Sequence, residues 1–88
     1  MQVNGQMIQR EIAGEHILIP VGEMALKVHG MITLTESGLL LWNKLQQDTD
    51  EDTLIDAILA EYDIDRETAA ADVAEFLDKL DAIGVLNR

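Results

Sequence analysis

The apolar residues of this chain change their spacing at Thr35, and that change limits what the chain can fold into. Before Thr35 they gather in short runs rich in isoleucine, which favour extended strands. After it they recur three and four residues apart, which is typical of amphipathic helices. The pattern predicts an α+β fold of winged helix-turn-helix type, in which a three-stranded antiparallel sheet is followed by three helices.

The first two strands are expected to form a hairpin. Residues 1–6 are interpreted as a flexible arm, and the extended apolar region of residues 7–21 is interrupted at residues 13–15, Ala-Gly-Glu, where a turn is expected. Residues 17–19 are all aliphatic, so both faces of that strand are expected to be at least partly covered. Pro20 lacks an amide donor, so the ladder should end there.

The third strand is predicted over residues 30–34, after a connection formed by residues 23–29. Thr35 follows it directly and is a good N-cap, because its side chain can accept hydrogen bonds from the amides that open a helix. The strand therefore ends where the first helix begins. We interpret residues 30–34 as an open sheet edge, with whose backbone another chain can pair.

Polar residues and a glycine mark the ends of the three predicted helices. The first helix closes in residues 46–48, and the second begins near Thr49 or Asp50, with acidic residues near its positive end. The third begins after Asp65, a plausible cap, and ends at Gly84, the usual residue for a left-handed stop.

The third helix carries two adjoining apolar surfaces. On a helical wheel, the predicted core stripe consists of Ala69, Val73, Phe76, Leu80 and Ile83. To one side of it the apolar surface continues through Ala70, Ala74 and Leu77, and Asp81 flanks it. These residues either pack against the sheet or form the wall of a groove beside the strand at residues 31–34.

Charge excludes several classes of partner. The chain has 17 acidic and 6 basic residues, a formal charge of −11, which repels the phosphates of nucleic acids and anionic membrane surfaces. It shows no apolar run long enough to span a membrane and no basic segment followed by an apolar stretch, so we expect neither membrane insertion nor secretion. We therefore expect a cytoplasmic protein whose partner is a protein or a peptide.

Size and residue types argue against catalysis. The 88 residues suffice for a single domain with one small core, which leaves little room for a large buried active site. There is no cysteine, and no spacing of histidine, serine and carboxylate residues is specific enough to indicate a metal or catalytic site. The chain is accordingly expected to be one domain over residues 1–88, without a cofactor and without enzymatic activity.

A series of short motifs, in a fixed order along the chain, resembles one protein family. The motifs are Ile19-Pro20-Val21-Gly22-Glu23, Gly30-Met31-Ile32-Thr33-Leu34-Thr35, Ser37-Gly38, Leu41-Trp42, Tyr62-Asp63-Ile64-Asp65, Asp72-Val73, Phe76-Leu77, Leu80 and Gly84-Val85-Leu86. In this order they resemble the PqqD-like family, the peptide chaperones of pyrroloquinoline quinone synthesis, and the wider set of leader-peptide recognition elements of ribosomal peptide natural-product pathways. The resemblance covers nearly the whole chain. Family members commonly have Asn or Asp where this chain has Thr35, which loosens any assignment to the quinone pathway in particular.

The resemblance implies a function in presenting a peptide. The leader of a precursor peptide would add as a further strand beside the third strand and lie against the third helix. The residues that match the family's peptide-binding positions are Met31, Ile32, Thr33, Leu34, Ala70, Val73, Ala74 and Leu77. Asp81, which flanks the helix residues, is predicted to belong to the same site. The bound leader would be handed to a separate modifying enzyme, often a radical enzyme using S-adenosylmethionine in this family, and tethering would raise the substrate concentration there.

Other functions are less consistent with the residues. A carrier protein would bear a phosphopantetheine arm on Ser37, but carriers have Asp-Ser followed by an aliphatic residue, whereas this chain has Glu36-Ser37-Gly38. A DNA-binding winged helix would place its third helix in the major groove, but the acidic residues of that helix outnumber the basic ones. An open edge also predicts a homodimer, formed by strand addition or by exchange of the first hairpin.

Overall fold

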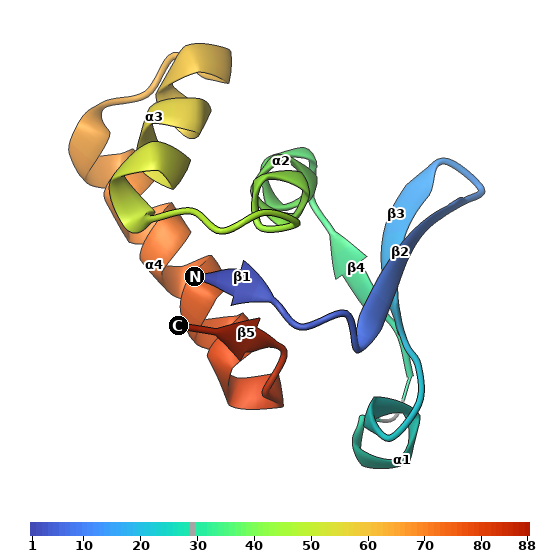
Figure 1. Ribbon diagram of the computed structural model, residues 1–88. Helices are drawn as coiled ribbons and strands as arrows, with labels where there is room; N and C mark the ends of the chain where they lie inside the picture. The colour runs from blue at the N-terminus through green and yellow to red at the C-terminus, as the bar shows by residue number, and fades with distance from the viewer. Residues whose placement is uncertain (29) are drawn as a thin grey trace.

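The computed structural model describes residues 1–28 and 30–88, so His29, at the end of the predicted connection, lies outside the described residues. In chain order the elements are β1 (Gln2–Val3), β2 (Met7–Ile12), β3 (Glu15–Pro20), α1 (Met24–Lys27), β4 (Ile32–Leu34), α2 (Glu36–Lys44), α3 (Glu51–Glu61), α4 (Arg66–Ile83) and β5 (Leu86–Asn87) (Figure 1). The predicted α+β class, with a three-stranded antiparallel sheet followed by helices, is confirmed. The structure adds a short strand near each end of the chain and the short helix α1 between β3 and β4.

The three-stranded sheet has the order β2-β3-β4, and both strand pairs are antiparallel. A two-residue turn joins β2 to β3, and its residues Ala13 and Gly14 have φ angles of +54° and +83°. Positive φ at both central residues is typical of a type I′ turn, whose twist matches that of the flanking strands. The predicted hairpin is confirmed, although Glu15 lies in β3 rather than in the turn.

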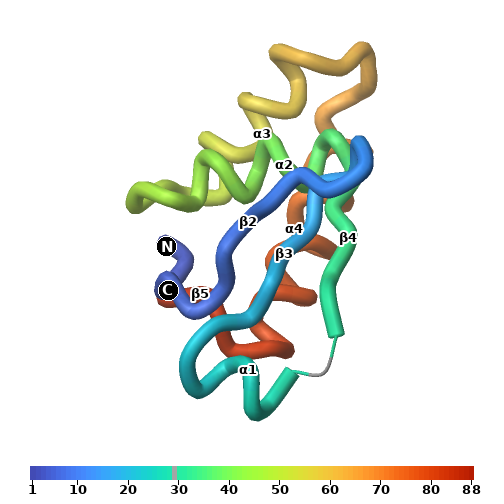
Figure 2. Tube along the Cα trace, turned by 90° about the vertical axis from the view of Figure 1, so that its right-hand side faces the viewer, coloured from blue at the N-terminus to red at the C-terminus, as the bar shows by residue number. Residues whose placement is uncertain are grey.

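The two faces of this sheet differ. Leu18 and Leu34 belong to the core on the helix side, and Ile32 packs against it. The opposite, outer face carries isoleucines and a few polar side chains, namely Ile8, Arg10, Ile12, Glu15, Ile17, Ile19 and Thr33. Ile17 is only 7% exposed and Ile19 is half-buried, as the run of aliphatic residues predicts, although no described helix lies over this face (Figure 2).

The N-terminal residues are not a flexible arm, so that prediction is wrong. β1 pairs antiparallel with β5, which brings the two chain ends side by side (Figure 1). The amide of Val3 donates to the carbonyl oxygen of Leu45 at 3.0 Å, and the N-terminal ammonium donates to Asp48 at 2.7 Å. The Val3 side chain is part of the core, so these residues gain both apolar burial and backbone pairing.

Side-chain caps fix where the three long helices begin. Thr35 accepts a hydrogen bond from the amide of Gly38 at 3.0 Å, which confirms it as the N-cap of α2. Asp50 and Asp65 cap α3 and α4 in the same way, at 2.8 and 2.7 Å from their amide donors. At the other end of α4, Gly84 has a φ of +78° and forms the predicted left-handed stop.

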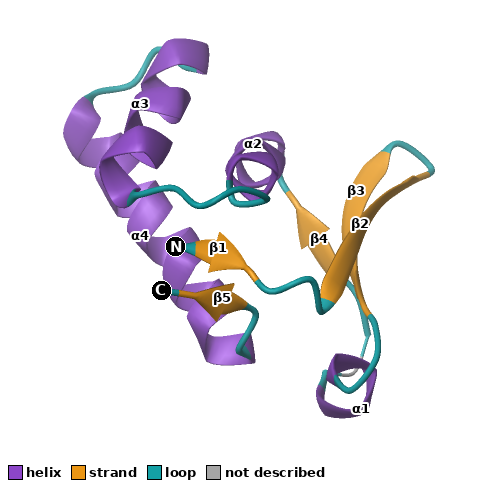
Figure 3. Ribbon diagram, in the orientation of Figure 1, coloured by secondary structure: helices purple, strands orange, loops and turns teal. Residues whose placement is uncertain are grey.

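The core lies between the sheet and the helices, which form separate layers in Figure 3. It consists of Val3, Met7, Leu18, Met24, Leu34, Leu41, Trp42, Leu45, Leu54, Ile55, Ile58, Ala69, Val73, Leu77, Leu80 and Val85. The wheel prediction for α4 is correct for Ala69, Val73 and Leu80, whereas Phe76 and Ile83 are only half-buried. Leu77 is fully buried instead, because α4 turns that side toward the core and not toward a groove.

No helix in the described part of the chain is long and apolar enough to cross a membrane.

The turn between β2 and β3 offers a direct test of backbone strain. Alanine with a positive φ is strained by about 1–2 kcal/mol, whereas asparagine tolerates this conformation. Ala13→Asn is therefore expected to raise the free energy of unfolding by about 1 kcal/mol, and the midpoint of thermal unfolding by about 4–8 °C. Ala13→Val should lower both, since a β-branched residue is disfavoured at positive φ. Equal stability of the two variants would contradict the turn geometry.

The helix caps predict how stability depends on pH. The hydrogen bond from the backbone amide of Thr68 lowers the pKa of Asp65 below its usual 3.8, and the hydrogen bonds from Thr53 lower the pKa of Asp50. A lowered pKa in the folded state contributes stability above the unfolded pKa, and this contribution is lost as the pH falls through the folded value. The variant with both Asp50→Asn and Asp65→Asn should therefore lose less stability than the wild type when urea unfolding is followed from about pH 5 to about pH 2. If the free energy of unfolding fell equally with pH in the wild type and the double variant, the prediction would be contradicted.

Candidate peptide-binding groove

β4 is paired along one edge only. Its residues pair with residues 16–18 of β3, and no described strand pairs with the other edge. Figure 2 shows β4 at the side of the sheet with no strand beyond it. The backbone groups of an edge strand alternate between those bonded to the neighbour and those directed outward. β4 therefore offers free donors and acceptors to an added strand, and an open edge is present over residues 32–34, two residues shorter than the predicted 30–34.

A compartment of about 150 Å³ lies between β4 and α4. We call it the β4 compartment; its lining residues are Leu18, Ile32, Thr33, Leu34, Thr35, Gly38, Phe76, Lys79, Leu80 and Ile83. Aliphatic and aromatic side chains dominate this lining, and Lys79 is the one charged residue in it. An apolar side chain of a strand added to β4 would be sheltered from water here.

A second compartment, of about 260 Å³, continues the first beyond the end of β4. We call it the α2 compartment; it is lined by Thr35, Ser37, Gly38, Leu41, Ile58, Asp72, Glu75, Phe76 and Lys79. The two compartments share Thr35, Gly38, Phe76 and Lys79, and together they form one groove along α4.

Gly38 allows the residues at the junction of the two compartments to approach one another. A Cβ atom at this position would lie 3.2 Å from the Thr35 hydroxyl oxygen, 3.4 Å from the ring of Phe76 and 3.5 Å from the side chain of Leu34. The first helical turn of α2 therefore packs closely against both β4 and α4. A larger side chain would move Phe76 or the start of α2.

The residues predicted on β4 lie at the groove. Ile32, Thr33 and Leu34 line the β4 compartment, and Met31, which is 62% exposed, directly precedes the strand. Their contact with a peptide stays a prediction. Ile32 and Leu34 face the helix side, whereas Thr33 lies on the outer face of the sheet.

The residues predicted on the third helix lie elsewhere. Val73 and Leu77 are fully buried in the core, and Ala70 packs against it. Ala74 is exposed but lines neither compartment, and Asp81 accepts a hydrogen bond from Arg88 at 2.7 Å. The wall of the groove is formed instead by Phe76, Lys79, Leu80 and Ile83.

This wall has a sequence signal of its own. Its members follow one another at spacings of three, one and three residues, which places them on one face of α4. The predicted groove wall contained Ala70 and Ala74, but the side of α4 that faces β4 carries the larger half-buried residues Phe76 and Ile83. Half-burial of Phe76 and Ile83 identifies the groove, and the wheel alone assigned both residues to the core.

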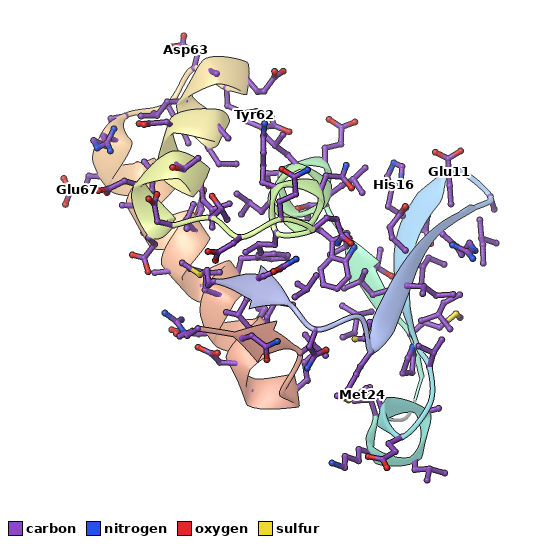
Figure 4. All side chains as sticks on the ribbon, viewed as in Figure 1. Glu11, His16, Met24, Tyr62, Asp63 and Glu67 are labelled. Atoms are coloured by element: carbon purple, nitrogen blue, oxygen red, sulfur yellow. The ribbon has the colours of Figure 1, made fainter. Side chains whose placement is uncertain are left out.

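Ser37 and His16 are the polar residues that a carrier or metal site would use, and both have ordinary structural surroundings. The Ser37 hydroxyl lies 3.2 Å from the Thr35 hydroxyl in the first turn of α2, so it supports a helix start. His16 lies near the tip of the hairpin beside Glu11 (Figure 4), with 3.7 Å between their nearest nitrogen and oxygen atoms. Among the described residues, no group of three or more His, Cys, Asp or Glu side chains is placed to hold a metal ion.

Comparison with known families identifies the chain. The family model for coenzyme PQQ synthesis protein D (PqqD) matches residues 15–86, from the start of β3 to β5. The chain belongs to the PqqD family. No curated protein matches this sequence.

The fold of this PqqD-family chain is also found in a solved structure described as TbiB1 in complex with the TbiA(beta) leader peptide. The two chains superpose with a TM-score of 0.77 at 26% sequence identity, over 99% of this chain and 95% of the other. Nearly all of the described architecture, including the open edge of β4, lies within the matched region.

The different roles of the two sides of α4 can be measured. Leu77→Ala removes a fully buried side chain and is expected to lower the free energy of unfolding by about 2–5 kcal/mol. Ile83→Ala removes a half-buried side chain at the groove and should cost about 1 kcal/mol or less. Both substitutions lie in α4, and urea unfolding of the two variants compares their losses of unfolding free energy. A larger loss for Ile83→Ala would mean that α4 is turned the other way.

Proposed function

We propose that this PqqD-family protein is a non-catalytic peptide chaperone that binds the leader of a ribosomally made precursor peptide. The leader adds as a strand to the open edge of β4, and its side chains enter the groove against α4. One observation carries the proposal: the unpaired edge of β4 borders an apolar compartment on the helix side. The likeness to a protein described in complex with a leader peptide supports it.

Strand addition divides the recognition between two kinds of contact. Hydrogen bonds to the β4 backbone supply affinity for many sequences, because every residue of a leader has the same backbone groups. Side chains that alternate along the added strand point toward the groove or away from it. The β4 compartment therefore selects among sequences, and the backbone edge does not.

In this function the protein presents the substrate and takes no part in the chemistry. A leader held along β4 leaves the rest of the precursor free to reach a separate modifying enzyme, which we propose to be a radical enzyme using S-adenosylmethionine. Tethering raises the local concentration of the precursor at that enzyme, to the millimolar range for a short linker.

The same edge is open to a second copy of the chain. A homodimer formed through β4 would occupy the hydrogen-bonding groups that the leader needs, so the two states would compete. The proposal therefore places self-association and leader binding in opposition at one surface.

Leader binding can be tested with synthetic, fluorescently labelled N-terminal segments of short reading frames that neighbour the gene for this chain. We expect a Kd of about 1 μM or tighter, measured by fluorescence anisotropy. Ile83→Glu places a charge in the β4 compartment and should weaken binding at least about tenfold. Ala82→Glu, at the adjacent exposed position outside the groove, is the matched control and should bind as the wild type does.

N-methylation of the leader tests strand addition itself. Methylating one amide at a time should weaken binding at every second residue of the paired segment, because alternate amides point toward β4. A uniform effect along the segment would overturn strand addition. Absence of any leader binding would overturn the proposed function.

A further inference from the structure

The groove has an uneven distribution of charge. In the β4 compartment Lys79 is the one charged residue, and it stands among apolar side chains such as Leu80 and Ile83. The chain as a whole carries a formal charge of −11, so most of its surface repels carboxylates. The apolar part of the groove is therefore bordered by a cation on a protein that is otherwise strongly acidic.

Lys79 is held loosely. Its ammonium nitrogen lies 3.4 Å from a carboxylate oxygen of Glu75, one helical turn earlier, and its side chain is 72% exposed. Exposed ion pairs of this kind are weak, because water and salt screen them. Lys79 can therefore leave Glu75 and pair with a carboxylate brought by a bound peptide, at little cost.

A peptide that covers the β4 compartment changes the surroundings of Lys79. It displaces water from the rim where the ammonium lies, and a charged group that loses water needs a new partner. A carboxylate in the peptide supplies a charge-assisted hydrogen bond, an amide supplies a weaker one, and a basic side chain adds repulsion. Peptides with the same apolar residue in the β4 compartment should thus bind with different strength, according to the charge of the peptide residue beside it.

We propose that Lys79 makes the groove select peptide segments that carry an aspartate or glutamate beside the apolar residue held in the β4 compartment. The inference rests on the proposed function and specifies the class of leader that the groove takes. It assigns Lys79 the role of a specificity-determining residue.

The α2 compartment limits where that carboxylate can lie. Asp72 and Glu75 line this compartment, so a peptide carboxylate placed there would meet two like charges. The favourable position is on the β4 side of Lys79, close to the apolar anchor. The selected spacing between anchor and carboxylate should therefore be fixed and short.

The inference can be tested with a displayed library of random peptides long enough to lie along β4 and the groove. Selection on the wild type should enrich peptides with an acidic residue at a fixed distance from an aliphatic or aromatic residue. Lys79→Glu should reverse the preference at that position toward lysine and arginine. Lys44→Glu changes the net charge equally at an exposed site outside the groove, and it should leave the preference unchanged.

Synthetic versions of the strongest peptide then give the size of the effect. Replacing its acidic residue by the amide should weaken binding to the wild type about tenfold, and replacing it by lysine should weaken binding further. Lys79→Gln should bind the acidic peptide no more tightly than the amide peptide. Selected peptides without an acidic preference, or a preference unchanged by Lys79→Glu, would overturn this inference and leave the proposed function intact. Failure to enrich any peptide would overturn both.

Discussion

β1 and β5 pair with each other in a sheet of their own, so neither of them occupies the free edge of β4. An edge strand of three residues with free backbone groups can pair with any extended segment that reaches it, and β1 and β5 are two short extended segments of this chain. Here the ends pair with each other, and Met1 and Val3 are further bonded to Thr49 and Leu45. Both termini thus lie toward the β2 side of the sheet, away from β4 (Figure 2), and the open edge is not covered by them.

The features that the sequence predicts well are those set by one residue and its immediate neighbours. Thr35, Asp65 and Gly84 act through their own side chain or φ angle, so their roles follow from local chemistry. The arm at residues 1–6 was mispredicted because its partner, β5, is more than eighty residues away. A two-residue strand has no periodicity of its own, and only the distant partner gives it order.

The helix wall of the groove shows a different limit. A helical wheel gives the angle between residues, so the adjoining apolar surfaces of α4 were found correctly. It does not say which surface faces α2 and α3 and which faces the sheet. Leu77, which the wheel left between the sheet and a groove and which the family resemblance placed in the groove wall, lies in the core, and Phe76, which the wheel placed in the core, lines the groove. Which side is buried depends on how α4 crosses the other elements, which is a property of the whole fold.

Thr35 links the fold to the groove. It ends β4, caps α2 through the amide of Gly38, and lines both compartments. Because the cap fixes the first turn of α2 against Phe76, the floor of the groove is formed by the same contacts that terminate the open strand. In the proposed function, a peptide added to β4 would meet side-chain pockets whose position relative to the backbone edge is already set. Binding would then need little reorganisation, so more of the contact energy would be available as affinity.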